Sequence, residues 1–266
     1  MASLLKRVKI SGSGEPVLIL HGMGGPQVLD DLEKFLSQKQ MIIKPTMYGF
    51  LAEDNIINYS DNYYMDFIEK LRMELKIEKW VVLGLSMGGR TAINYTIRYE
   101  NRVEKLILLN SVGIGYMNPL FRFKPFKKLF STLIYTVLKY RPFQDALGKA
   151  DFVDTTSSVY INARDGVAAL LENKLVRRNF ANILVNIGCP IIDLKGNLKA
   201  LQTDTLILWA KDDKTAPIKW AHELKNEISN SKIFILDSYK HMALLEAPQF
   251  YTDNILAFLQ SIDGTL

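Results

Sequence analysis

Short runs of apolar residues recur along the chain, each bounded by residues that favour turns. The runs cover residues 17–20, 80–83, 106–109, 206–209 and 233–236. A run of about four residues without a polar position predicts a strand that is buried on both faces, as in a parallel sheet. We therefore expect these segments to form the central strands.

Between the apolar runs, hydrophobic residues recur with the period of an amphipathic helix. The clearest case spans residues 64–75, where one helix face carries Tyr64, Phe67, Ile68, Leu71 and Leu75. Ser60 or Asp61 can cap the first turn of this helix. We expect further helices over residues 27–38, 87–99, 218–228 and 248–259. Strands that alternate with helices predict an α/β fold with a mostly parallel central sheet flanked by helices.

A long segment without strand-like runs interrupts this alternation. About ninety residues separate the strands at 106–109 and 206–209, too many for one crossover connection. We expect residues 112–200 to form an inserted, mainly helical cap, and residues 1–111 and 201–266 to form the core.

Composition narrows the class of protein. Apolar residues make up 48% of the chain and charged residues 23%, which excludes wholesale disorder. The single cysteine, Cys189, and the histidines His21, His222 and His241 form no cluster with metal-ligand spacing, so we expect neither a metal nor a cofactor.

Because residues 1–10 lack a signal-peptide pattern, we expect a cytoplasmic protein. We expect Cys189 to be a small buried residue rather than a reactive thiol.

The net charge of +5 is concentrated in one segment. Residues 112–144 contain six Lys or Arg and no Asp or Glu, so the rest of the chain carries a net charge of −1. This distribution argues against a nucleic-acid-binding protein. We expect a cap helix with its apolar face over the active site and its lysines in water, and weak interfacial contact through residues 121–141 without stable membrane insertion. The chain is expected to be a monomer or a homodimer.

The segment Gly84-Leu85-Ser86-Met87-Gly88 lies between a predicted strand and a predicted helix. This G-x-S-x-G pattern in this context is typical of a nucleophile elbow. A strand that reverses sharply into a helix leaves no room for a Cβ two residues before or after the serine, and Gly84 and Gly88 meet that need. The Met87 N–H then points in front of Ser86 as an oxyanion donor.

The loop after the first apolar run, His21-Gly22-Met23-Gly24-Gly25, is rich in glycine. Gly22 and Gly24 allow its backbone to approach a substrate closely, and we assign the Met23 N–H as the second oxyanion donor. We expect His21 to order this loop by hydrogen bonding, without a direct chemical role. We expect none for His222 either.

The HGMGG loop, the GLSMGG elbow and the WAKDD and KHMALLEAP segments resemble the α/β-hydrolase superfamily, in the capped branch of small carboxylesterases and meta-cleavage-product hydrolases. The resemblance implies a catalytic triad in the order Ser, Asp, His. It matches Ser86 and His241, and it places the acid at Asp213, with Asp212 as the alternative. Lys240 and Ala210 stand where the family usually has glycine.

The resemblance implies a serine carboxylesterase that acts on small hydrophobic esters through an acyl-enzyme. The alternative is a carbon–carbon bond hydrolase of the meta-cleavage type, in which a cap arginine holds the substrate carboxylate. Arg164, Arg177 and Arg178 are candidates for that role, whereas Met242 stands where such enzymes commonly have Trp. A second alternative is a non-catalytic binding or membrane-surface module with the same fold.

Overall fold

The computed structural model describes residues 2–55, 60–112, 123–187 and 194–261. Its centre is a seven-stranded sheet in the order β1-β3-β2-β4-β5-β6-β7. β1 is antiparallel to β3, and the other neighbouring strands are parallel. The strands are β1 (Val8–Ser11), β2 (Pro16–Leu20), β3 (Met41–Pro45), β4 (Trp80–Leu85), β5 (Val103–Leu109), β6 (Asp204–Ala210) and β7 (Ser231–Leu236).

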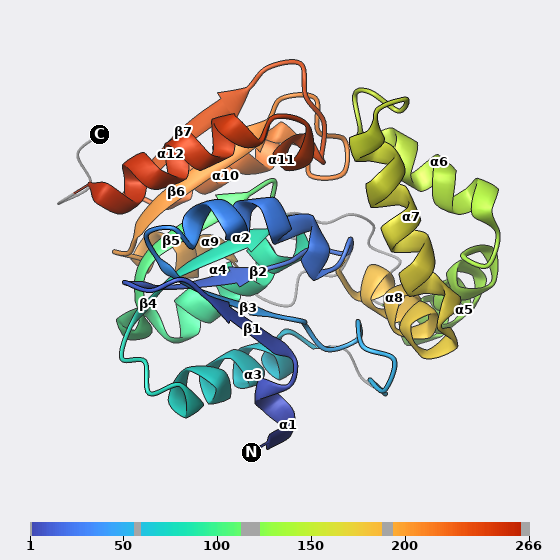
Figure 1. The fold of residues 1–266 in the computed structure, drawn as a ribbon, viewed down its shortest axis with the longest axis horizontal. Helices are drawn as coiled ribbons and strands as arrows, with labels where there is room; N and C mark the ends of the chain where they lie inside the picture. Colours follow the sequence, from blue (N-terminus) through green and yellow to red (C-terminus); the bar gives the residue numbers. More distant parts are fainter. Residues whose placement is uncertain (1, 56–59, 113–122, 188–193, 262–266) are drawn as a thin grey trace.

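Helices cover both faces of this sheet (Figure 1). In chain order they are α1 (Ala2–Leu5), the 3-10 helix η1 (Pro26–Leu29), α2 (Asp30–Leu36), α3 (Asp61–Glu74), α4 (Met87–Arg98), the 3-10 helix η2 (Glu100–Arg102), α5 (Lys124–Val137), α6 (Arg141–Asp151), α7 (Ser158–Glu172), α8 (Lys174–Ile187), α9 (Leu194–Ala200), α10 (Ile218–Glu227), α11 (Ala243–Glu246) and α12 (Pro248–Gln260).

Consecutive strand residues point into two separate cores, one on each face of the sheet. In β2, Leu18 and Leu20 join the core formed with α3, α4 and α10, whereas Val17 and Ile19 join the core formed with α2 and α12. This alternation follows from the two-residue period of a strand. It explains why the runs 17–20, 80–83, 106–109 and 206–209 in β2, β4, β5 and β6 are apolar at every position, and it confirms the expected α/β fold.

The register of the sheet brings the carboxyl ends of the central strands to one edge. Leu20 pairs with Gly84, and Leu85 pairs with Leu109. The loops that follow β2, β4 and β5 therefore start side by side. This edge is where open α/β sheets bind ligands.

Four of the five predicted central strands and most predicted helices are confirmed. The run at 233–236 does form a strand, β7, but it lies at the edge of the sheet and is only partly buried, so it is not central or covered on both faces. The helix expected over 27–38 is also corrected. The structure divides it into η1 and α2. The structure also shows that Ser60 is the residue that caps the N-terminus of α3. Its side chain accepts from the Tyr63 N–H at 3.3 Å, whereas Asp61 pairs with Arg90.

The sequence pattern did not predict β1 and β3. β1 is half exposed along its length, so it lacks a continuous apolar run. β3 contains Lys44, which is buried because it forms ion pairs with Asp30 and Glu33 on α2. A buried cation is tolerated when it is paired, but here its partners lie on another element, which the local pattern of β3 does not reveal.

Helices α5 to α8 form a lobe beside the sheet, whereas α9 contacts α10 (Figure 1). The last helix of the segment 112–200 thus packs with a core helix, and the expected domain boundaries remain a prediction. Within the described ranges, every helix is too short or too polar to cross a membrane.

The expected orientation of α5 needs correction. α5 packs against α8, and part of its apolar surface faces solvent: Leu129 is 70% exposed and Leu133 is 53% exposed. The apolar residues of α5 cover a wider part of the helix surface than the part that contacts α8. Some of them therefore face solvent.

The buried ion pair between Asp61 and Arg90 links α3 to α4, with Oδ2 and Nη2 2.9 Å apart. Asp61→Asn removes the charge that compensates the buried guanidinium, so we expect a loss of about 3 kcal/mol in the free energy of unfolding. Urea denaturation measures it. The control is Asp66→Asn on the same helix, whose pair with Arg98 is exposed and should change stability by less than about 1 kcal/mol. Equal losses in both variants would contradict the expectation that the buried pair stabilises the fold more than the exposed pair.

Candidate active site

Ser86 occupies the tight turn between β4 and α4. Its backbone has φ 54° and ψ −116°, a conformation that is strained for a residue with a side chain. A Cβ at Gly84 would collide with the backbone at Gly88, and one at Gly88 would collide with the Leu20 carbonyl. The two glycines therefore have the steric role predicted from the sequence. Met87 is the first residue of α4, directly after the serine.

Ser86, His241 and Asp213 form a continuous chain of hydrogen bonds. Ser86 Oγ lies 2.9 Å from His241 Nε2, and His241 Nδ1 lies 2.7 Å from Asp213 Oδ2. All three side chains are buried. With Nδ1 donating to the carboxylate, Nε2 is left as an acceptor for the serine hydroxyl. The imidazole is thereby oriented to take a proton from Ser86.

The Asp213 carboxylate is fixed by several donors. Its Oδ1 accepts from the backbone N–H groups of Thr215 and Ala216, at 2.9 and 2.7 Å. The neighbouring Asp212 is exposed at the surface, and its N–H donates to the Tyr239 carbonyl. Of the two aspartates that the sequence left open, the structure thus places Asp213 against His241.

Asn110 and Tyr251 also support the carboxylate, although the sequence analysis missed both. Asn110 Nδ2 donates to Asp213 Oδ2 at 2.8 Å, and the Tyr251 hydroxyl donates to Asn110 Oδ1 at 2.7 Å. A signal was present for Asn110, because it directly follows the strand run 106–109. A polar side chain at that place lies at the carboxyl edge of the sheet, where it can support a catalytic group.

Opposing effects act on the pKa of His241. Burial lowers this pKa because it disfavours the charged imidazole, whereas the charge and hydrogen bond of Asp213 and the charge of Asp151 raise it. The net result is a pKa above the ordinary value for histidine. The site therefore favours the imidazolium that forms when His241 takes up a proton.

The loop after β2 lies against the serine. A Cβ on Gly22 would come within 2.9 Å of the Ser86 Cβ, so the backbone approaches the nucleophile as expected. His21 fixes the loop: its Nδ1 donates to the Gly22 carbonyl at 2.7 Å, and its Nε2 accepts from the Met47 N–H at 2.9 Å. Burial lowers the pKa of His21 to about 4, which keeps the ring neutral. Donation by Met23 and Met87 to an oxyanion remains a prediction.

Other sequence-predicted residues lie apart from the triad. His222 is on the exposed side of α10, in keeping with its expected lack of a chemical role. Gly24 faces Val28, whose Cγ2 would be 2.7 Å from an added Cβ. Cys189 lies outside the described residues, so its expected burial remains a prediction.

The cap arginines differ in their surroundings. Arg178 is exposed and donates to Asn55 Oδ1, and Arg164 pairs with Asp165 at 3.0 Å. Arg177 is 7% exposed, and its Nη1 donates to the Leu171 carbonyl at 2.8 Å. The Nε atom of Arg177 is buried without a hydrogen-bond partner in the structure. Its guanidinium also lies over the Tyr135 ring, 5.0 Å from the ring centre. Of the three candidates, Arg177 is therefore the one that is buried.

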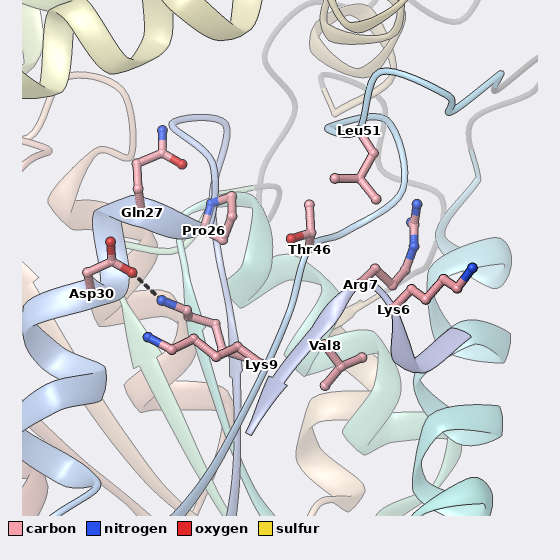
Figure 2. A pocket seen from close by; sticks show the side chains of 10 residues that line it. Lys6, Arg7, Val8, Lys9, Pro26, Gln27, Asp30, Thr46 and Leu51 are labelled. Atoms are coloured by element: carbon pink, nitrogen blue, oxygen red, sulfur yellow. Dashed lines mark hydrogen bonds and ion pairs between the residues drawn. The ribbon is translucent and has the colours of Figure 1, made fainter. Parts of the chain in front are cut away.

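A separate pocket of about 380 Å³ lies beside β1 and does not include the triad. Figure 2 shows Lys6 and Arg7 on one side of it and Lys9 and Asp30 on the other. Three of its four cations are paired with carboxylates: Arg7 with Asp54, Lys9 with Glu33, and Lys44 with Asp30 and Glu33. This pairing leaves little positive charge for an anionic ligand.

Known proteins resemble the chain over nearly its whole length. The chain is 24% identical over 262 residues to the 2-hydroxy-6-oxo-6-phenylhexa-2,4-dienoate hydrolase of Comamonas testosteroni, covering 94% of this chain and 89% of that one. The meta-cleavage product hydrolase of Pseudomonas fluorescens superposes with a TM-score of 0.79 at 21% identity, covering 95% and 93% of the two chains. A thermophilic esterase from Thermogutta terrifontis superposes with a TM-score of 0.80 at 21% identity, covering 95% and 92%.

One family model matches most of the chain. The model of the family described as serine aminopeptidase, S33, matches residues 55–248, a range that contains all three triad residues. The fold of the solved structures agrees with that assignment. The chain therefore belongs to this family of hydrolases, within the α/β-hydrolase superfamily.

Proposed function

We propose that this protein is a serine hydrolase in which Ser86 attacks a substrate carbonyl. The observation that carries the proposal is the hydrogen-bonded chain from Asp213 through His241 to Ser86. A hydroxyl, an imidazole and a carboxylate at these distances form the machinery of nucleophilic acyl transfer.

The steps follow from the geometry. His241 Nε2 takes the hydroxyl proton as Ser86 Oγ bonds to the carbonyl carbon, and the Met23 and Met87 N–H groups stabilise the oxyanion. The bond to the leaving fragment breaks when the oxyanion collapses, and the His241 imidazolium gives its proton to that fragment. Water, activated by His241, then releases the acyl group from Ser86.

We propose a carbon–carbon bond as the bond cleaved, in a substrate of the meta-cleavage type. In such a vinylogous diketone, the electron pair of the broken bond is delocalised over the leaving fragment, which then takes up a proton. The names of the relatives that match most of the chain support this choice over the expected carboxylesterase. Such a substrate carries a carboxylate that needs a cation, and we propose Arg177, the buried one of the three cap arginines, for that role.

A carboxylic ester is the second candidate substrate. The same triad cleaves an ester, in which the leaving alkoxide takes the proton from His241. Two observations favour it: Met242 follows the histidine where carbon–carbon hydrolases commonly have Trp, and a solved esterase has the same fold.

The α5 segment supports a further proposal, of weak contact with an anionic membrane surface. Leu129 and Leu133 are exposed on α5, and so are Lys124 and Lys128. Apolar side chains flanked by lysines fit an interface of negatively charged lipid headgroups. A second copy of the chain fits less well, because it would bring the same cations face to face.

Within the proposed function, the first prediction concerns the triad. Ser86→Ala should lower kcat by about 10⁴- to 10⁶-fold, because it removes the nucleophile, and Asp213→Asn by about 10⁴-fold, because it disturbs the imidazole tautomer. Steady-state kinetics on the substrate that is turned over measures both. Asp212→Asn is the matched control and should retain near wild-type kcat. Similar losses in the two aspartate variants would contradict the assignment of the acid.

The second prediction separates the two substrates. We expect kcat/KM to be higher for 2-hydroxy-6-oxo-6-phenylhexa-2,4-dienoate, followed by its loss of colour, than for p-nitrophenyl acetate, butyrate or decanoate. Arg177→Met should raise KM for the dienoate by about tenfold or more and leave the neutral esters nearly unchanged, since only the dienoate carries a carboxylate. Turnover of esters alone would favour the carboxylesterase. No turnover and no fluorophosphonate labelling of Ser86 would defeat both proposals.

The third prediction concerns the membrane surface. The protein should sediment with vesicles that contain phosphatidylglycerol and not with vesicles of phosphatidylcholine alone, and the double variant Lys124→Glu, Lys128→Glu should lose this binding. The control variant Lys34→Glu, Lys39→Glu makes the same charge change at exposed positions of the core. Equal losses in the two variants would show only a net-charge effect. Dimerisation without vesicle binding would assign the surface to a second copy.

A further inference from the structure

The end of α6 lies against the loop that carries the triad histidine. The Met242 N–H donates to the Asp151 carbonyl at 3.0 Å, and Lys240 Nζ donates to the Phe152 carbonyl at 2.8 Å. Lys240 is the residue that replaces the glycine usual in the family. Its side chain therefore has a structural use here: it holds the cap segment 151–154 to the histidine loop.

A carboxylate secures the same segment from the other side. Glu246, in α11, accepts from the backbone N–H groups of Val153 and Asp154, each at 2.9 Å. The cap backbone at this point is thus held by donors and acceptors of the core on both sides of His241. Residues 151–154 keep a fixed position relative to the imidazole as long as these bonds persist.

The side chain of Asp151 points toward the triad. Its Oδ1 accepts from the Thr215 hydroxyl at 2.6 Å, two residues after the acid Asp213. The charged groups that face this carboxylate are His241 and Lys240 from the histidine loop and Asp213 from the acid loop. A second negative charge therefore lies near the imidazole, beside the one supplied by Asp213.

We propose that Asp151 is a positioning residue of the cap, which stabilises the protonated form of His241 and makes that stabilisation depend on the docked position of segment 151–154. The proposal rests on the function proposed above for the triad. Asp151 acts through His241 and need not touch the substrate.

The directions in which the pKa values of His241 and Asp151 are shifted agree with this role. The charge of Asp151 is among the causes that raise the pKa of His241, whereas Glu246 is not. Burial raises the pKa of Asp151 itself, and the nearby His241, Thr215 and Lys240 oppose that rise. The two groups therefore stabilise each other most when Asp151 is ionised and His241 is protonated.

The test is the titration of His241 by NMR in Asp151→Asn. Asparagine keeps a carbonyl that accepts from Thr215 but loses the charge, so we expect the His241 pKa to fall. The chain has only three histidines, and the exposed His222 serves as an internal reference. Where the enzyme is active, the acid limb of kcat/KM should move to lower pH, because the reaction needs neutral His241.

Glu246→Gln is the matched control, since it removes a charge from the same junction but keeps an acceptor for the cap backbone. We expect its His241 pKa to stay at the wild-type value. An unchanged pKa in Asp151→Asn, or an equal fall in Glu246→Gln, would overturn the proposal. The titration does not depend on turnover, so its failure is distinguishable from a failure of the proposed function, which would appear as an inactive and unlabelled Ser86.

Discussion

The bond between the Asp213 carboxylate and the His241 ring organises the candidate site, and it lies in the protein interior. A carboxylate in that setting is stabilised only when its oxygens are hydrogen-bonded. Here two backbone amides, the Asn110 amide and the imidazole donate to it. These donors come from separate loops, so the carboxylate ties the loops after β5, β6 and β7 together. The orientation of His241 toward Ser86 depends on that assembly.

The parallel sheet brings these loops together without long connections. Its parallel strands end at one edge, so the loops that carry Ser86, Asp213 and His241 emerge within reach of one another. The strained backbone of Ser86 lies between a buried strand and a buried helix, which hold it in place. The buried strands and helices thus fix the positions of the loops, and the loops carry the side chains of the proposed reaction.

The cap adds a second level of organisation. Among the described residues, hydrogen bonds join it to the core at segment 151–154, which meets the loops of Asp213 and His241, and at α8, where Asn179 Nδ2 donates to the Asp54 carbonyl. A movement of the cap relative to the core would therefore act on groups that contact the loops of Asp213 and His241. This arrangement gives the cap a route to influence His241.

The sequence by itself determined most of the central strands and the elbow at Ser86, because each depends on residues that are close together along the chain. Its short motifs also marked His241 and the pair Asp212 and Asp213, through their resemblance to α/β-hydrolases. The pairing of Asp213 rather than Asp212, the support from Asn110 and Tyr251, and the approach of Asp151 were decided only by the tertiary structure. The strand β3 belongs to the same group, since Lys44 is buried only through carboxylates on another element. These features arise from contacts between residues that are distant in the chain, and a local pattern of hydrophobic and polar residues contains no information about such contacts.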